Sequence, residues 1–128
     1  MAVILGIDDS AEFKGMLFDF LLAMGHKLLN ADNGREGVKK ALEAKPDLIL
    51  MDVMMPDMGG FEALKELRAD DETRDIPVFI ITGSAFDTKM GDLFKQEPNC
   101  REFLDKTISP TLLNKKIEAV LESRGKRP

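Results

Sequence analysis

The stretch Asp47-Leu-Ile-Leu-Met-Asp52 decides the fold. Its central residues are all apolar, which is typical of a strand buried on both faces in the middle of a parallel sheet. Residues 77–82, Pro-Val-Phe-Ile-Ile-Thr, show the same pattern later in the chain. Residues 2–7 form a third run rich in strand-forming side chains, and residues 27–31 and 101–104 are weaker candidates. The sequence therefore predicts five strands.

Amphipathic segments separate these runs, and their apolar residues recur at three- and four-residue steps, which predicts helices. Ser10 and Ser109 are predicted N-caps, while Gly25 and Pro98 end two of the helices. One further helix is predicted over residues 61–68. The apolar faces of the other four are predicted to contain Phe13, Met16, Leu17, Phe20, Leu21 and Met24; Val38, Ala41 and Leu42; Phe86, Met90, Leu93 and Phe94; and Leu113, Ile117, Val120 and Leu121.

Five strands alternating with five helices predict an α/β fold, a doubly wound parallel sheet covered by helices on both faces. The pattern fills residues 1–128 without a repeat or a linker, so one domain is expected. The eight methionines are expected to fill the core. His26 follows a predicted helix end and is expected to be a surface turn residue.

Composition narrows the class of protein. With 44% hydrophobic and 32% charged residues the chain is typical of a globular domain. Its formal net charge of −5 argues against nucleic acid as a direct partner. No apolar run approaches the roughly 20 residues that span a bilayer. The single cysteine, Cys100, cannot form an internal disulfide, and residues 1–7 lack the features of a secretory signal. We therefore expect a cytoplasmic protein that does not bind membranes.

Five polar side chains stand where predicted strands end. Asp8 and Asp9 follow the first strand, Asp52 follows the third, Thr82 ends the fourth, and Lys106 comes just after the fifth. The carboxyl ends of parallel strands share one edge of a sheet, where ligands bind. We therefore expect these residues to meet in one pocket, although each taken singly also has an ordinary structural interpretation.

This set of residues indicates phosphoryl chemistry. Three carboxylates in one pocket repel one another, and a divalent cation with oxygen ligands, such as Mg²⁺, relieves the repulsion. A carboxylate can attack phosphorus and form an acyl phosphate. The hydroxyl of Thr82 and the ammonium group of Lys106 can stabilise the phosphoryl oxygens.

The sequence resembles the receiver domains of two-component response regulators over essentially its whole length. The resemblance implies a flavodoxin-like fold with strand order 2-1-3-4-5. The motifs that carry it are Asp8-Asp9, Met51-Asp52-Val-Met-Met-Pro56 followed by Gly59-Gly60, Ile81-Thr82-Gly83, and Phe103-Leu-Asp-Lys106.

The resemblance also implies roles for single residues. Asp52 matches the phosphoacceptor, Asp9 the direct metal ligand, and Asp8 the acidic residue that usually acts through water. Met54 would offer its backbone carbonyl to the Mg²⁺ ion.

Thr82 matches the switch hydroxyl, Lys106 the lysine that pairs with the phosphoryl group, and Phe103 the aromatic switch. One position departs from the family pattern, because Thr107 follows the lysine where a proline, often cis, is usual. The geometry of the Lys106–Thr107 bond is therefore left open.

The implied function is a phosphoacceptor module of a two-component phosphorelay. It would take phosphate from the phosphohistidine of a histidine kinase or a histidine phosphotransfer domain. It would then change a surface read by a downstream protein or output domain, and it would catalyse only its own phosphorylation and dephosphorylation.

Two alternatives belong to other classes. An aspartate-nucleophile phosphatase acting on small molecules often has a second aspartate, as general acid, two residues after the nucleophile. Here that position is Met54, which cannot donate a proton. A pseudo-receiver would bind a partner without being phosphorylated, and only Thr107 favours it.

Overall fold

A computed structural model describes residues 2–53, 58–83 and 88–125. Strands and helices alternate along this part of the chain, as the sequence predicts. The elements are β1 (Val3–Ile7), α1 (Ala11–Ala23), β2 (Lys27–Ala31), α2 (Gly34–Ala44), β3 (Leu48–Met51), α3 (Gly60–Ala69), β4 (Val78–Thr82), α4 (Thr88–Lys95), β5 (Cys100–Asp105) and α5 (Pro110–Ser123).

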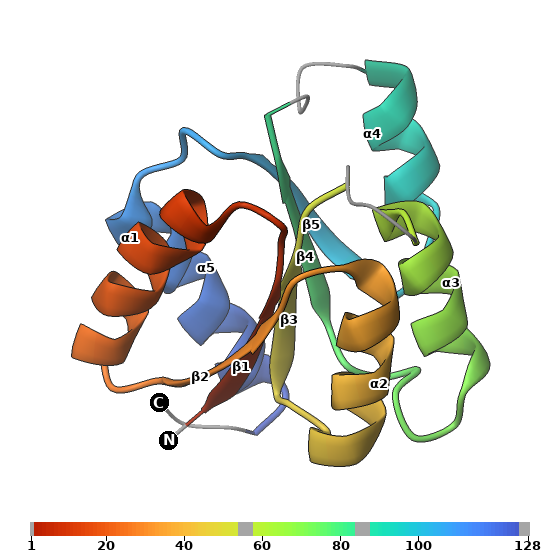
Figure 1. Ribbon diagram of the computed structural model, residues 1–128, viewed down its shortest axis with the longest axis horizontal. Coiled ribbons are helices and arrows are strands. Elements are labelled where there is room, and N and C mark those ends of the chain that lie inside the picture. Colours follow the sequence, from red (N-terminus) through yellow and green to blue (C-terminus); the bar gives the residue numbers. More distant parts are fainter. Residues whose placement is uncertain (1, 54–57, 84–87, 126–128) are drawn as a thin grey trace.

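The sheet is parallel throughout, with strand order β2-β1-β3-β4-β5. β3 lies at its centre, and all four of its residues are buried, as expected for the stretch that begins at Asp47. Helices α1 and α5 cover one face of the sheet, while α2, α3 and α4 cover the other (Figure 1). The predicted doubly wound α/β fold and its strand order are confirmed.

Two hydrophobic cores lie on opposite faces of the sheet, because successive side chains of a strand point to opposite sides. In β3, Ile49 and Met51 belong to the core under α2, α3 and α4. Leu48 and Leu50 belong to the core under α1 and α5. The unbroken apolar run of β3 thus supplies both cores at once.

The helix ends follow the predicted capping residues. The Ser10 hydroxyl accepts a hydrogen bond from the Phe13 N–H at 3.3 Å, and the Ser109 hydroxyl accepts one from the Leu112 N–H at 3.2 Å. Gly25, directly after the cap of α1, has a φ of +94°, a conformation that favours glycine. Local sequence therefore fixes where α1 begins and ends, and where α5 begins.

The predicted apolar faces were too wide in three helices. Met16 is 72% exposed, and Met24, Leu42 and Leu93 are exposed as well. Each helix packs against the sheet on one side only, so the residues at the margins of an apolar stripe stay in solvent. Met51 and Met58 are buried, so the expected role of methionine as core filler holds for these two but not for Met16 and Met24. Phe86 lies outside the described residues.

His26 corrects the expectation of a surface turn residue, because it is only 3% exposed. Its Nε2 lies 2.8 Å from Oδ1 of Asn114 on α5. Helix α5 covers the turn between α1 and β2, and this contact between residues far apart in the sequence has no local signal. Cys100 is half-buried, and burial, followed by the charge of Glu102, raises the pKa of its thiol to about 11.

None of the helices in the described ranges has the length and apolar character required to cross a bilayer.

Candidate functional site

The sheet brings the predicted site residues together at the carboxyl ends of its strands. Asp8 follows β1, Asp52 follows β3, Thr82 ends β4, and Lys106 follows β5. The hydrogen bonds of the sheet continue to these positions, since the Asp52 N–H donates to the Ile7 carbonyl at 3.0 Å and the Lys106 N–H donates to the Thr82 carbonyl at 3.1 Å. The backbone therefore fixes four elements of the site relative to one another.

Asp8, Asp9 and Asp52 form a cluster in which one carboxylate oxygen from each lies within 4.8 Å of the others. Asp8 and Asp52 are buried, with 4% and 7% exposure, while Asp9 is exposed. Oxygen donors of this kind suit Mg²⁺, which is usually held by one or two carboxylates and several waters. The donor set therefore fits a magnesium ion.

Lys106 bridges the two buried carboxylates. Its Nζ lies 3.0 Å from Oδ2 of Asp8 and 3.3 Å from Oδ2 of Asp52. The Oδ1 atoms of the two residues accept backbone N–H groups, from Ser10 at 2.7 Å and from Val53 at 2.7 Å. Each carboxylate thus has one oxygen fixed by the backbone and the other directed at the same ammonium group.

Electrostatics in the pocket shift the pKa of Asp8 and of Lys106 upward. Burial is the main cause for Asp8, and the charge of Asp52 adds to it, against the hydrogen bonds from Ser10 and Lys106. For Lys106, burial acts to lower the pKa, but the hydrogen bond to Asp8 and the charge of Asp52 outweigh it. The ammonium form of Lys106 is therefore stabilised, while Asp8 holds its negative charge at a cost.

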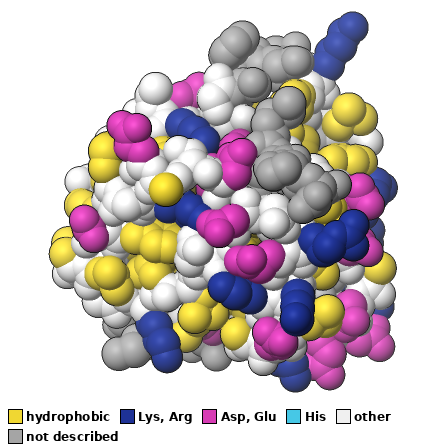
Figure 2. Space-filling view, in the orientation of Figure 1, with side chains coloured by type: hydrophobic (Ala, Val, Ile, Leu, Met, Phe, Trp, Pro, Cys, Tyr) yellow, Lys and Arg dark blue, Asp and Glu magenta, His cyan; other side chains and the backbone are white. Residues whose placement is uncertain are grey.

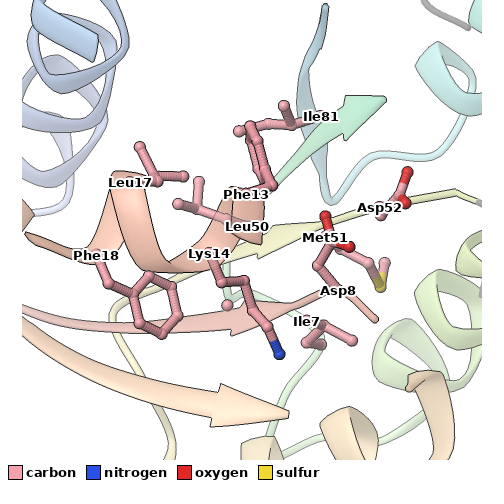
Figure 3. A pocket seen from close by; sticks show the side chains of 11 residues that line it. Ile7, Asp8, Phe13, Lys14, Leu17, Phe18, Leu50, Met51, Asp52 and Ile81 are labelled. Carbon is pink, nitrogen blue, oxygen red and sulfur yellow. The ribbon is translucent and has the colours of Figure 1, made fainter. Parts of the chain in front are cut away.

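Helix α1 contributes an aromatic residue that the sequence predicts only as part of an apolar face. The ring of Phe13 has its centroid 4.7 Å from Nζ of Lys106, within the range of a cation–π contact. Figure 3 shows Phe13 on the same cavity as Asp8 and Asp52. Helical periodicity gives no sign of this contact, because Phe13 and Lys106 lie at opposite ends of the sequence.

The loop after Lys106 has an ordered geometry without the usual proline. The N–H and the hydroxyl of Thr107 both donate to Oδ1 of Asp105, at 2.8 and 2.7 Å, and these bonds lower the pKa of Asp105. Among the described residues no peptide bond is cis, so the Lys106–Thr107 bond is trans. A proline at position 107 has neither an N–H nor a hydroxyl to donate. The turn that Thr107 forms with Asp105 is therefore specific to the residue that replaces the usual proline.

Thr82 and Phe103 lie on neighbouring strands near the pocket. Thr82 is buried at the end of β4, and Phe103 is half-buried on β5, beside Ile80 in the strand register. The ring centroids of Phe103 and Phe94 are 5.6 Å apart, so Phe103 connects β5 to α4. Met54, the predicted source of a carbonyl ligand, lies outside the described residues.

Of the predicted glycine pair, Gly60 has the stricter steric requirement. A Cβ on Gly60 would lie 2.6 Å from the carbonyl oxygen of Asp52 and 2.9 Å from Cα of Val53, whereas a Cβ on Gly59 would come no closer than 3.8 Å to the Val53 carbonyl oxygen. Glycine at position 60 therefore lets the start of α3 approach the backbone that carries Asp52.

Comparison with known proteins identifies the family. The model of the response regulator receiver domain matches residues 4–118. The chain belongs to the response regulator receiver family. This receiver domain is 40% identical to the protein PilH of Pseudomonas aeruginosa over 121 residues, which cover 94% of this chain and 98% of PilH. It is 35% identical to the polar-differentiation response regulator DivK of Brucella anthropi, over 80% of this chain and 82% of DivK.

Solved structures agree with this assignment. The receiver domain superposes on the chemotaxis response regulator CheY4 of Vibrio cholerae with a TM-score of 0.85 and 31% identity, covering 94% of this chain and 99% of that one. It also shares its fold with the receiver domain of the sensor histidine kinase PA1611 from Pseudomonas aeruginosa, with a TM-score of 0.86, 22% identity, and coverage of 94% and 98%. That structure has a magnesium ion in its active site cleft. Receiver domains are phosphoacceptor signalling modules, and this chain is one of them.

Asp8→Asn should stabilise this receiver domain at neutral pH in the absence of Mg²⁺. The folded protein binds the Asp8 proton more tightly than the unfolded chain, so its free energy of unfolding falls as the pH rises above the ordinary carboxyl pKa of 3.8. Asparagine cannot ionise and still accepts the Ser10 N–H. We expect urea unfolding to show a more stable variant at pH 7 and a difference that closes as the pH approaches 3.8.

Asp71→Asn is the matched control, because the Asp71 side chain is 88% exposed and its ion pair with Arg74 is worth at most about 1 kcal/mol. An Asp8→Asn protein less stable than the parent at pH 7, or a difference that did not change with pH, would contradict the assigned cost of the Asp8 charge.

Proposed function

We propose that this receiver domain accepts a phosphoryl group on Asp52, with Mg²⁺ held by Asp8, Asp9 and Asp52. The observation that carries the proposal is the cluster of these carboxylates, with ligand oxygens within 4.8 Å of one another and Lys106 bonded to two of them. The cluster offers a nucleophile, a metal site and a cation within one pocket. The proposal assigns the direct metal contact to Asp9, a water-mediated one to Asp8, and a carbonyl ligand to Met54.

In the proposed reaction a carboxylate oxygen of Asp52 attacks the phosphorus atom of a phosphohistidine. The new O–P bond forms as the P–N bond breaks, and the imidazole leaves and takes up a proton. Mg²⁺, when bound, neutralises negative charge on the phosphoryl oxygens. Nζ of Lys106 already lies 3.3 Å from Oδ2 of Asp52. Its ammonium group can therefore exchange the carboxylate for a phosphoryl oxygen as its hydrogen-bond partner with little movement.

The proposed donor is a histidine kinase or a histidine phosphotransfer domain, and it would have to approach from the side of α1. An apolar groove of about 470 Å³ lies there, lined by Phe13, Met16 and Phe20 of α1 and by Ile108 and Pro110 after β5, with Lys106 at its edge. Figure 2 shows hydrophobic side chains gathered over α1. Exposed apolar surface of this kind is typical of protein contact sites, and its position beside Lys106 suits a donor that must reach Asp52.

The proposed output begins at Thr82 and Phe103. In the phosphorylated protein the Thr82 hydroxyl would bind a phosphoryl oxygen, and Phe103 would turn into the space that it leaves. Phenylalanine has no hydroxyl group, so turning this side chain inward buries no polar atom without a hydrogen-bond partner. The half-buried ring of Phe103 against Phe94 supports the proposal, because its rotation would move its contact with α4.

We propose that residues 1–128 act as one receiver domain in the cytoplasm, with no direct contact to nucleic acid or membrane. We also propose that its catalysis is limited to its own phosphorylation and dephosphorylation. The sequence contains Asp8, Asp9, Asp52 and Lys106 without a loss, which argues against the pseudo-receiver alternative. Thr107, the residue that favoured that alternative, forms an ordered turn with Asp105.

Asp52→Asn should abolish phosphorylation, because an amide cannot act as the nucleophile. The parent protein, given acetyl phosphate and Mg²⁺, should gain one phosphoryl group that is lost in alkali, as an acyl phosphate is. Intact-protein mass spectrometry measures both. Asp71→Asn should be labelled like the parent, and equal labelling of Asp52→Asn would sink the proposed nucleophile.

Met16→Lys should slow phosphorylation by a donor protein about ten-fold, which corresponds to about 1.4 kcal/mol of lost interaction. A lysine there would place a charge in the apolar groove. Labelling by acetyl phosphate, which needs no docking surface, should not change. Leu22→Lys is the matched control, because Leu22 is also exposed on α1 but does not line the groove. Equal slowing by both variants, or by neither, would contradict docking at the groove.

Thr82→Ala should still allow phosphorylation of Asp52, but phosphorylation should no longer change the conformation of α4 and β5. A ligand changes a conformation only through interactions that differ between the two states, and the variant lacks the hydroxyl that makes this difference. Backbone chemical shifts with and without beryllofluoride, a phosphoryl mimic, measure the coupling. We expect large shifts over residues 88–105 in the parent and small ones in the variant. The same shifts in both proteins would rule out this route from pocket to surface.

A further inference from the structure

Lys14 is a buried lysine that the proposed reaction does not use. It lies on α1, and only 6% of its surface is exposed. Its Nζ donates to Oδ1 of Asp32 at 2.8 Å and to the carbonyl oxygen of Ala31 at 3.2 Å. Burying an ammonium group is unfavourable unless it is paired, and here Asp32 supplies the opposite charge, with its pKa lowered by the Lys14 hydrogen bond. The pair is electrically neutral, so its effect on the nearby pocket comes from the position that it imposes.

The Ala31 carbonyl oxygen connects Lys14 with the loop that carries Asp8 and Asp9. The same oxygen accepts the backbone N–H of Asp8 at 3.1 Å. Figure 3 shows the Lys14 side chain leaving α1 beside Asp8 and Ile7, on the cavity that Asp8 and Asp52 also line. The segment from Asp8 to Lys14 consists of the Asp8–Ser10 loop and the first turn of α1. Both ends of this segment therefore bind one carbonyl oxygen, that of Ala31 at the end of β2.

Of two further hydrogen bonds, one lies within the Asp8–Ser10 loop and the other joins the loop to α1. The Ser10 N–H donates to Oδ1 of Asp8 at 2.7 Å, and the Lys14 N–H donates to the Ser10 carbonyl at 3.1 Å. Asp9 lies between these bonds and is exposed. No hydrogen bond joins the Asp9 side chain to another residue of the described ranges. The position of its carboxylate therefore depends on the backbone of the loop.

We infer that Lys14 is a positioning residue for Mg²⁺ binding, which acts by closing the loop that presents Asp9. The inference rests on the proposed function, in which Asp9 is a direct metal ligand. Groups that orient metal ligands typically change metal affinity by about 10–100-fold when removed. Lys14 acts through the backbone instead of through a bond to the ligand, so its effect belongs at the lower end of this range.

The test compares Lys14→Met with Asp32→Asn. Methionine keeps the length and apolar stem of the side chain but removes both hydrogen bonds, whereas Asp32→Asn removes the ion pair and leaves the bond from Lys14 to Ala31. Mg²⁺ is titrated against the amide chemical shifts of unphosphorylated protein, so that the readout is independent of phosphorylation. We expect the Kd for Mg²⁺ to rise about ten-fold in Lys14→Met and to stay within about two-fold of the parent in Asp32→Asn. Hydrogen exchange of the Asp8 amide should be faster in Lys14→Met.

Asp9→Ala, measured in parallel, separates this inference from the proposed function. If Asp9→Ala bound Mg²⁺ as tightly as the parent, the assignment of the metal ligands would fail. If Asp9→Ala were weakened but Lys14→Met kept the parent Kd, the positioning role alone would be overturned, even with a lower urea midpoint. Should Lys14→Met not fold, Lys14→Gln, whose shorter amide cannot reach both acceptors, is measured with the same expectation and the same overturning result.

Discussion

A single ammonium group lies between two buried carboxylates at the carboxyl edge of the sheet, and the geometry of the pocket depends on it. The pKa of the buried Asp8 is raised by burial and by the charge of Asp52, so its negative charge at this position needs a cation nearby. Lys106 provides that cation at hydrogen-bond distance from both. Asp9, exposed beside them, leaves the cluster with more negative than positive charge, which is the condition under which a divalent ion is attracted.

The backbone keeps this arrangement of charges in place. Asp52 is tied to β1 through the Ile7 carbonyl, and Lys106 is tied to β4 through the Thr82 carbonyl. Gly60 allows α3 to approach the peptide that carries Asp52. The carboxylates are therefore attached to backbone that is held rigidly by the sheet and by the two cores beside it. A local movement that separated the carboxylates would break hydrogen bonds of the sheet.

Much of this could be predicted from sequence, because the decisive signals are local. The apolar run after Asp47 marks a strand buried on both faces, and polar residues at strand ends mark one edge of the sheet. What could not be predicted depends on contacts between distant segments. The burial of His26 under α5 is one example, and the contact of Phe13 with Lys106 is another. Lys14 has the sequence appearance of an ordinary helical lysine, and only the fold reveals that it reaches Ala31. The exposure of Met16 likewise depends on which side of α1 packs against the sheet, and helical periodicity does not specify this closely enough.

The separation of the two hydrophobic cores has a consequence for how such proteins diverge. Alternate side chains of the strands serve different helical layers, and the two cores lie on opposite faces of the sheet. Substitutions that reshape the outer surface of α1 and α5 need no compensating change in the packing of α2, α3 and α4. One side of the molecule can thus acquire a new recognition surface while the other keeps its own. A scaffold divided in this way can retain its backbone while its sequence drifts, as the TM-score of 0.85 at 31% identity with CheY4 illustrates.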